Sequence, residues 1–304
     1  MRSIIFSNNL ASATSRFGPT IDVEMNHVRF FGSLTLNLWD CGGQEAFMDS
    51  FLASQRNTVF RDVGVLIYVF DIETKDFERD VLYYIECLEA CKKNSPEAGI
   101  FVLIHKMDLV YGGKKEKDRA FGAKKRELDK YSGNTLIRMF ATSIWDESLY
   151  KAWSRIVHTL IPNAPQLSEH LTTFCSICSA TEVVLFERNT FLIIARSGKY
   201  TGNLDDFFPP DPAPGAEEEE LNPGRFEKMS ELIKTFKHSC SRLQEQFHSL
   251  EIRFSNFTAV LELMTSNTYV MAVVADTDVQ TATLRLNIRL ARERFEELQQ
   301  GMLT

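Results

Sequence analysis

The run Gly64-Val-Leu-Ile-Tyr-Val-Phe70 is apolar at every position after its glycine, which predicts an interior strand buried on both faces of a sheet. Similar apolar runs follow at 99–104 and 136–141, and helical patterns near 76–94 and 118–131 separate the three runs. Strands that alternate with helices predict a mostly parallel sheet with helices on both faces. We therefore expect the first half of the chain to be an α/β domain of the doubly wound type.

The rest of the chain completes this domain and adds a second one. The remaining patterns of the first half are strands at 27–31 and 34–39 and a helix at 148–160. Pro162 and Pro165 then interrupt the chain. The patterns that follow are a helix at 166–178, strands at 182–187 and 190–195, a long helix at 225–247, strands at 251–255, 258–264 and 269–275, and a closing helix. We predict one domain over residues 1–162 and, over residues 163–304, an antiparallel sheet with helices beside it.

Two helices of the second half have apolar sides. The helix at 225–247 places its apolar residues on one side, as a helix packed on a core does. The closing helix repeats Leu284 and Ile288 at helical spacing, which predicts a buried face. Leu286 and Leu290 lie off that face and indicate a second apolar surface for a partner.

The formal net charge of −7 is concentrated in one segment. Between Tyr200 and Gly224 the chain has seven acidic residues and no Lys or Arg, together with a Pro-rich run that cannot bury apolar surface. We predict an acidic, disordered loop at about 199–224. The remaining charges balance, so no basic footprint for a nucleic acid is present and no nucleic-acid partner is expected.

Membrane and metal signals are weak. No apolar run approaches the ~20 residues that a spanning helix needs, and no signal-peptide or lipidation pattern is visible. We therefore expect membrane residence only through partners, without direct insertion. The six cysteines lie in or beside apolar stretches, as reduced thiols of a cytosolic protein do. Cys175 and Cys178 form a Cys-x-x-Cys pair without two further ligands at zinc spacing, so core packing is favoured over a metal site.

Four short polar motifs occur in order in the first half of the chain. They are Gly18-Pro-Thr20, Asp40-Cys-Gly-Gly-Gln44, His105-Lys-Met-Asp108 and Thr142-Ser-Ile144. The last three follow directly after predicted strands. Because ligands of parallel sheets bind at the carboxyl ends of the strands, these motifs are expected to converge on one site. Their order and separation are those of a small GTPase.

The first two motifs supply groups for Mg²⁺ and for the hydrolysis of a nucleoside triphosphate. Thr20 is expected to give its hydroxyl to the metal, after a mobile segment that begins near the nucleotide-binding Thr14. Asp40 is expected to hold the metal through water. Gly43 lets its backbone N–H approach the γ-phosphate without a Cβ in the way, and Gln44 is expected to orient the attacking water. The alternative for Asp40 to Gln44 is a strand end followed by a Gly-Gly turn.

The third and fourth motifs supply groups that recognise a base. Asp108 can accept hydrogen bonds from N1–H and the exocyclic amine of guanine, which adenine cannot supply, so GTP and GDP are expected rather than ATP. Lys106 is expected along the phosphate and ribose side of the base. Ser143 and Ile144 are expected to present backbone amides to guanine O6. His105 occupies the place of the usual Asn, and a polar cluster at a strand exit is the alternative for this motif.

These motifs and their surroundings resemble the Rag GTPases of the Rag A/B subtype. The resembling stretches are Thr20-Ile-Asp-Val-Glu24, Leu36-Asn-Leu-Trp-Asp-Cys-Gly-Gly-Gln44, His105-Lys-Met-Asp-Leu109, Thr142-Ser-Ile-Trp-Asp-Glu-Ser-Leu-Tyr-Lys-Ala-Trp153, Leu185-Phe-Glu-Arg188, Arg225-Phe-Glu-Lys228 and Thr265-Ser-Asn-Thr-Tyr-Val-Met271. That family also has His in place of Asn at the position of His105. The resemblance covers nearly the whole chain, and it implies a Ras-like GTPase domain followed by an α+β roadblock-type domain.

The resemblance also implies a function. A Rag A/B-type subunit hydrolyses GTP and pairs through its roadblock domain with a Rag C/D-type subunit. An adaptor complex holds the pair on the cytosolic face of the vacuole or lysosome, where the GTP-loaded form activates the TOR kinase complex when amino acids are plentiful. The chain shows no arginine finger of its own, so a GTPase-activating protein is expected as a further partner.

One expected motif is missing, because the 304 residues contain no Gly-x-x-x-x-Gly-Lys-[Ser/Thr] phosphate loop. Residues 1–9 resemble the helix that follows this loop, so the central first strand and the phosphate cradle are expected to be absent. Two explanations remain: the true start lies upstream of Met1, or a short form exists that no longer binds GTP. In the second case the chain is a non-enzymatic interaction protein that dimerises through residues 166–304.

Overall fold

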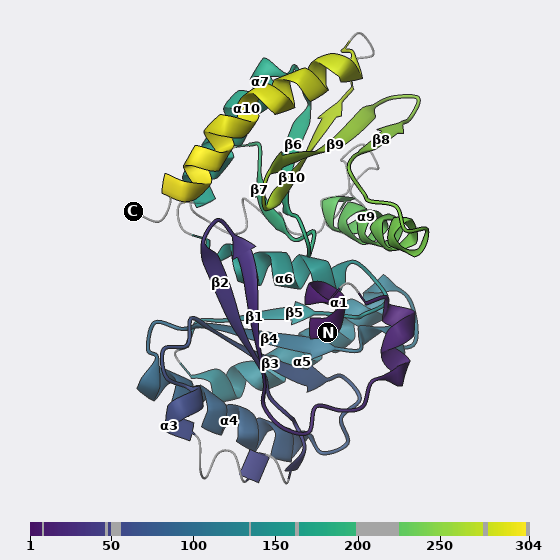
Figure 1. The fold of residues 1–304 in the computed structure, drawn as a ribbon. Helices are drawn as coiled ribbons and strands as arrows, with labels where there is room; N and C mark the ends of the chain where they lie inside the picture. Colours follow the sequence, from purple (N-terminus) through teal and green to yellow (C-terminus); the bar gives the residue numbers. More distant parts are fainter. Residues whose placement is uncertain are drawn as a thin grey trace. The chain divides into compact units, whose positions relative to one another are not determined.

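The computed structural model of the chain describes residues 1–7, 9–45, 48–49, 56–133, 135–161, 164–198, 225–275 and 279–301. These residues form two compact units (Figure 1). The first unit contains Met1 and residues 11–25 and 38–152; the second contains residues 2–10, 26–37 and the described part of 153–304. The predicted acidic loop at 199–224 lies outside the described residues. The predicted limits of the two domains, 1–162 and 163–304, remain a prediction.

The predicted strands and helices of the first half are confirmed, with ends that shift by a few residues. In chain order the elements are α1 (Arg2–Phe6), η1 (Ala11–Arg16), β1 (Glu24–Phe31), β2 (Leu34–Asp40), α3 (Arg56–Val59), β3 (Val65–Asp71), α4 (Phe77–Asn94), β4 (Gly99–His105), η2 (Met107–Leu109), α5 (Lys114–Ser132), β5 (Ile137–Ala141) and α6 (Ser148–His158). The boundary between the two units falls within α6. The order of strands and helices is that of an α/β domain.

The strands of the first half divide between two sheets rather than one. β1 and β2 pair with each other, and β3, β4 and β5 form a parallel sheet in that order. β3 therefore lies at an edge, with Val69 40% exposed, and the prediction of an interior strand at 64–70 is wrong. The interior strand is β4, which is buried from Ile100 to His105. In the described part of the chain no strand pairs with the outer edge of β3.

Two helices cover one face of the parallel sheet. α4 and α5 lie side by side there (Figure 1). Phe70 of β3, Ile104 of β4, Tyr84 of α4 and Leu128 of α5 belong to one buried cluster. Because both strand-to-strand connections run through these helices, all three strands end at the same edge of the sheet. The polar motifs that follow the strands are thereby brought to that edge.

The second unit contains the predicted antiparallel sheet. Its further elements are α7 (Ala164–Ile177), β6 (Glu182–Glu187), β7 (Ile193–Arg196), α9 (Arg225–Arg242), β8 (Leu250–Arg253), β9 (Thr258–Thr265), β10 (Thr268–Val274) and α10 (Thr281–Gly301). The five strands are ordered β7-β6-β10-β9-β8, and every pair is antiparallel. α7 and α10 lie side by side (Figure 1), with the rings of Phe174 and Phe295 6.1 Å apart. This order of elements is the predicted α+β roadblock-type arrangement.

The long helix α9 is shorter than predicted. It ends at Arg242 because Gln244 adopts a left-handed conformation with φ +60°. The amide of Glu245 then donates to the carbonyl of Cys240 at 3.0 Å, which satisfies one of the last helical carbonyls. Phe247 therefore lies beyond the helix, where its ring contacts Tyr269 of β10.

The sequence predicts that the apolar residues of α9 pack on one core. Only some of them do. Phe226 and Ile233 are buried, whereas Leu232 is 53% exposed and Phe236 45% exposed. Strand β8, which follows this helix in the chain, is an edge strand of the sheet. The second unit therefore combines an exposed apolar helix side with an edge strand.

Strand β7 begins later than predicted, at Ile193, because a turn follows β6. The buried carboxylate of Glu187 accepts hydrogen bonds from the Thr190 amide at 2.7 Å, the Thr190 hydroxyl at 2.6 Å and the Asn189 amide at 3.0 Å. Burial raises the pKa of Glu187, and these hydrogen bonds oppose that rise. The turn between β6 and β7 is thus closed by a carboxylate inside the unit.

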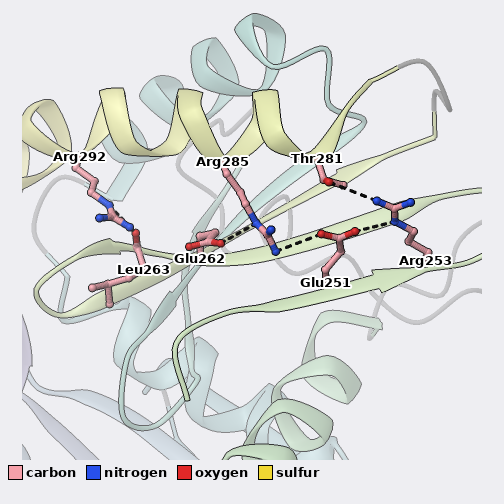
Figure 2. Close-up of polar contacts among 7 residues, drawn as sticks. All are labelled: Glu251, Arg253, Glu262, Leu263, Thr281, Arg285 and Arg292. Carbon is pink, nitrogen blue, oxygen red and sulfur yellow. Dashed lines mark hydrogen bonds and ion pairs between the residues drawn. The ribbon is translucent and has the colours of Figure 1, made fainter. Parts of the chain in front are cut away.

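A chain of ion pairs joins strands β8 and β9 to helix α10 (Figure 2). Arg285 of α10 contacts Glu251 of β8 at 3.2 Å and Glu262 of β9 at 3.0 Å. Arg253 extends the chain by pairing with Glu251 at 2.7 Å, and Arg292 donates to the carbonyl of Leu263 at 2.9 Å. The edge strand is therefore held in place by α10.

Two further predictions concern the second unit. Cys175 and Cys178 are both buried, so the predicted core packing of this pair is confirmed. Within the described ranges, no cluster of His, Cys, Asp and Glu could hold a metal ion. On α10, Leu286 and Leu290 are exposed as predicted, and their partner stays a prediction. No helix in the described part of the chain is long and apolar enough to cross a membrane.

Candidate functional site

The carboxyl ends of β3, β4 and β5 bring the base-side motifs together. Asp71 at the end of β3 is opposite His105 at the end of β4, and Ile104 is opposite Ala141 of β5. The Thr142 amide continues the ladder by donating to the Ile104 carbonyl at 2.9 Å. The third and fourth motifs therefore meet at one edge of this sheet, as expected. Asp40 ends β2, which belongs to the separate β1-β2 sheet, so its convergence with them stays a prediction.

His105 joins the third motif to the fourth. Its Nδ1 lies 2.9 Å from the hydroxyl of Thr142, and the Met107 amide donates to the Thr142 carbonyl at 3.2 Å. Burial lowers the pKa of His105 to about 4, so the ring is neutral at pH 7. A neutral imidazole provides one donor and one acceptor, so it can tie the two loops together without bringing a charge to the site.

Asp108 is held by the fourth motif. The hydroxyl of Ser143 donates to Asp108 Oδ1 at 2.6 Å, and the Trp145 amide donates to the same hydroxyl at 3.0 Å. Each carboxylate oxygen has two lone pairs, so Asp108 can still accept two hydrogen bonds from a ligand. The carboxylate is oriented in advance for a group with two adjacent donors.

The two amides assigned to guanine O6 differ in their surroundings. The Ser143 amide already donates to the Ser148 hydroxyl at 2.9 Å, and this hydroxyl in turn donates to Asp146. The Ile144 amide has no hydrogen-bond partner among the residues that the structure describes. Ile144 is therefore the better placed of the two predicted donors.

Lys106 adopts a left-handed backbone conformation with φ +63°, which is uncommon for a residue with a side chain. Its Nζ contacts Asp71 Oδ2 at 2.5 Å, and Asp71 Oδ1 accepts from the Glu73 amide at 3.0 Å. Asp71 was not among the predicted site residues. It is the first polar residue after the apolar run of β3, the same signal that singled out Asp40 after β2.

The phosphate-side residues come from two other segments of the first unit. The hydroxyl of Thr14 donates to the carbonyl of Ala11 at 2.7 Å within η1, and Thr20 is half-buried in the stretch before β1. Asp40 is the last residue of β2 and is also half-buried. A Cβ added at Gly43 meets no atom within 4 Å, so the protein leaves open space there.

Gln44 has an unusual side-chain environment. Its Oε1 atom is buried and has no hydrogen-bond partner among the described residues. A buried acceptor without a partner is costly, and such groups in native proteins call for a specific explanation. A water or a ligand group beside Gln44 provides one.

The chain is similar to known GTP-binding proteins. The family described as "Gtr1/RagA G protein conserved region" matches residues 1–233. GTP-binding protein gtr1 of Schizosaccharomyces pombe is 49% identical over 97% of this chain and 90% of its own length. Ras-related GTP-binding protein A of Dictyostelium discoideum is 48% identical over 98% of this chain and 92% of its own length.

Among solved structures, Myxococcus xanthus MglB is similar over 47% of this chain and 93% of its own length, at 10% identity and a TM-score of 0.35. The roadblock-type assignment rests on the element order of the second unit rather than on this likeness. Fold and site together define a G protein with a Ras-like nucleotide domain and a roadblock-type domain. The chain belongs to the Gtr1/RagA family.

Proposed function

We propose that this protein is a guanine-nucleotide switch that binds GTP and GDP with Mg²⁺ and hydrolyses GTP. The observation that carries the proposal is the Asp108 carboxylate, which Ser143 orients at the carboxyl edge of the parallel sheet. Two acceptors side by side match the N1–H and exocyclic amine of guanine. The names of the similar proteins gtr1 and Ras-related GTP-binding protein A agree with this ligand.

Two residues are proposed to act on the triphosphate end. Gln44 would orient the attacking water through its buried Oε1 atom, which has no hydrogen-bond partner among the described residues. Gly43 would offer its amide across the open space beside it. Neither residue supplies a positive charge for the transition state, so rapid turnover is expected to require an activating protein.

The donor set also fits Mg²⁺. This ion keeps several waters and takes one or two protein ligands together with phosphate oxygens, rather than a cage of carboxylates. The hydroxyl of Thr20 and, through water, the carboxylate of Asp40 would serve as those ligands. Bound Mg²⁺ would neutralise charge on the phosphates.

A substitution that changes the preferred base tests whether the ligand is a guanine nucleotide. In Asp108→Asn the new amide can accept from N1–H but presents a donor where the guanine amine needs an acceptor. We expect GTP affinity to fall about 100-fold or more, and affinity for xanthosine triphosphate, which has an oxygen at that place, to rise. Titration with fluorescent nucleotides measures both. GTP affinity equal to that of the parent protein would remove Asp108 from the proposed role.

Binding of the phosphates needs a separate experiment, because the 304 residues contain no phosphate loop. Mass spectrometry of the endogenous protein's N-terminal peptide decides between the two explanations. A peptide with Gly-x-x-x-x-Gly-Lys-Ser directly before Met1 supports GTP turnover. A mature terminus at Met1 supports the second candidate function, a non-enzymatic subunit that acts through pairing.

We further propose that the protein pairs with a Rag C/D-type subunit through its roadblock-type domain. The exposed Leu232 and Phe236 of α9 and the edge strand β8 support this proposal, since all three could be covered by a partner. Ras-related GTP-binding protein C of Mus musculus is 26% identical over 64% of this chain. The proposed partner type is therefore a relative of this chain.

Light scattering of the co-expressed pair tests this partner. Leu232→Glu combined with Phe236→Glu is expected to abolish the 1:1 complex. Leu82→Glu on α4, at an exposed leucine outside the predicted pairing surfaces, serves as the control and should leave the complex intact. A complex that survives the double substitution would exclude the α9 surface. A monodisperse monomer of residues 166–304 would count against pairing through this domain.

The cellular role is proposed from membership of the family. The heterodimer would reside on the cytosolic face of the vacuole or lysosome through an adaptor complex and would activate the TOR kinase complex when amino acids are plentiful. Gln44→Leu should slow GTP hydrolysis and favour this active complex. Co-purification of the TOR kinase complex with Gln44→Leu, compared with the parent protein, measures the effect.

A further inference from the structure

Gln44, Glu45, Met48 and Asp49 belong to a turn, and the side chains of the last three contact helix α4. The Met48 amide donates to the Gln44 carbonyl at 2.9 Å. The side chain of Met48 is buried in the same cluster as Val81 and Tyr84 of α4. The turn therefore has an apolar anchor one turn after Gln44.

Two polar contacts on the same helix flank this anchor. Arg79 Nη1 donates to Glu45 Oε2 at 2.8 Å, and the Tyr83 hydroxyl donates to Asp49 Oδ1 at 2.9 Å. Arg79 and Tyr83 are four residues apart on α4, and Glu45 and Asp49 are four residues apart on the turn. Residues at this spacing lie on one side of a helix, so the contacts form two successive rungs between α4 and the turn.

The arginine rung is also fixed at its other end. Arg79 Nη2 pairs with Asp76 Oδ2 at 3.0 Å, directly before the first residue of α4. The planar guanidinium therefore bridges the start of α4 and the residue next to Gln44. A fork that binds two carboxylates in fixed directions restricts where Glu45 can lie.

We propose that Arg79 and Tyr83 are positioning residues for GTP hydrolysis, which fix the turn that presents the buried Oε1 of Gln44. This inference rests on the proposed function and adds two residues to its site. The contacts are exposed at their rims, with Arg79 42% and Glu45 60% exposed, so they contribute little to overall stability. The hydrolysis rate is more sensitive to these contacts than stability is, because a shift of about 1 Å at a reacting group can cost roughly 100-fold in rate.

The test compares Arg79→Met and Tyr83→Phe with exposed controls of the same chemistry, Arg61→Met and Tyr111→Phe. We expect single-turnover GTP hydrolysis to fall about tenfold in Arg79→Met and less in Tyr83→Phe, while GTP affinity and the melting temperature stay at parent values. Arg79→Lys, which keeps the charge, should recover part of the rate. Amide hydrogen exchange at residues 44–49, measured without nucleotide, should become faster in both variants but in neither control.

The outcomes separate the two proposals. Exchange at 44–49 that matches the controls would overturn the positioning role, as would fast exchange with an unchanged hydrolysis rate. A parent protein that turns over no GTP would overturn the proposed function and the catalytic part of this inference. The exchange data would then still decide whether Arg79 and Tyr83 hold the turn.

Discussion

The five-stranded sheet of the second unit and the three-stranded parallel sheet of the first unit are completed in different ways. In the second unit, neighbouring strands are antiparallel, and β6 at the inside of the sheet is buried from Val183 to Glu187. In the first unit, helices connect parallel strands, and the edge strand β3 is only half-buried, with Val69 exposed. β6 has a paired strand on each side, β7 and β10, whereas β3 pairs only with β4 among the described strands. The first unit is therefore the one whose sheet leaves an apolar strand incompletely covered.

Both units contain buried polar groups, and some of these are satisfied within the protein while others are not. In the second unit, Arg285 pairs with Glu251 and Glu262, and the buried Glu187 is satisfied by its own turn. In the first unit, Gln44 Oε1 is buried without a partner among the described residues, and Lys106 has a left-handed backbone. Local costs of these kinds also occur in the second unit, for example at Ser168 Oγ and at the left-handed Gln244. Those of the first unit lie at the candidate site, where a ligand can compensate for them.

The largest expected effect comes from shortening one buried leucine in the interior strand of each sheet. Leu103→Ala in β4 and Leu185→Ala in β6 each leave a cavity and should destabilise by about 2 to 5 kcal/mol. Val69→Ala at the edge of the first sheet should cost about 1 kcal/mol or less. Urea unfolding, with hydrogen exchange to report each unit, measures the three. A Val69→Ala cost as large as that of Leu103→Ala would mean that β3 is covered in solution.

The next effect concerns a buried lysine of the second unit. Lys234 is 4% exposed, and its Nζ donates to the carbonyls of Ile4 at 2.5 Å and Ile5 at 2.7 Å. Burial lowers its pKa from 10.5 to about 7; the nearby Lys237 lowers it further, and Glu187 opposes the change. The unfolded chain therefore binds this proton between pH 7 and 10.5, where the folded chain has released it. Stability should rise with pH across that window, by about 4 kcal/mol.

Lys234→Met should flatten this rise, and Lys92→Met on the exposed side of α4 should preserve it. Urea midpoints collected from pH 7 to 10 measure the slope. An equal slope in Lys234→Met and the parent protein would show that this amine does not titrate in the expected window.

One buried histidine in each unit gives a smaller effect on the acid side. Burial lowers the pKa of His105 in the first unit and of His158 in the second to about 4. Their contribution to stability is complete above the ordinary pKa of 6.5 and is lost as the pH falls through about 4, by about 1 to 3 kcal/mol for each ring. His105→Asn and His158→Asn should each remove part of the acid sensitivity. If His105→Asn unfolds over the same acid range as the parent protein, the buried neutral ring is not responsible.

The smallest effect is expected from the ion-pair chain in Figure 2. Arg285→Met leaves Glu251 and Glu262 without this partner and should cost about 1 kcal/mol, since partly exposed ion pairs contribute little. Arg294→Met breaks only the exposed pair with Glu297 and should be nearly neutral. Thermal melting at low and high salt measures both. No difference between the two variants would exclude a role for Arg285 in holding β8.

Much of the fold could be predicted because it depends on local patterns of apolar residues. The apolar runs at 99–104 and 182–187 coincide closely with β4 and β6, and Leu284 and Ile288 are buried on α10 as their spacing predicts. The end of α9 could not be predicted in this way. Its apolar spacing continues to Phe247, but the left-handed Gln244 stops the helix, and no glycine marks that point.

The site shows the same division. That Asp108, His105 and Ser143 lie near strand ends could be predicted, because each stands at or just after an apolar run. Their hydrogen bonds are observed, and their role in binding a base stays a prediction. Asp71 also stands at the end of an apolar run, but the family motifs that predict the site do not include it. The occupied amide of Ser143 could not be foreseen, since it depends on where the Ser148 hydroxyl lies.

The sequence by itself determined the kinds of elements, their order and the polar motifs at the strand ends, because each depends on residues within a few positions of one another. Only the tertiary structure decided that β3 is an edge strand, that Asp71 pairs with Lys106 and that Arg79 meets Glu45. The Asp71–Lys106 contact joins residues 35 positions apart, and the Arg79–Glu45 contact joins residues 34 positions apart. Such contacts follow from the register and packing of whole elements, which local spacing does not specify.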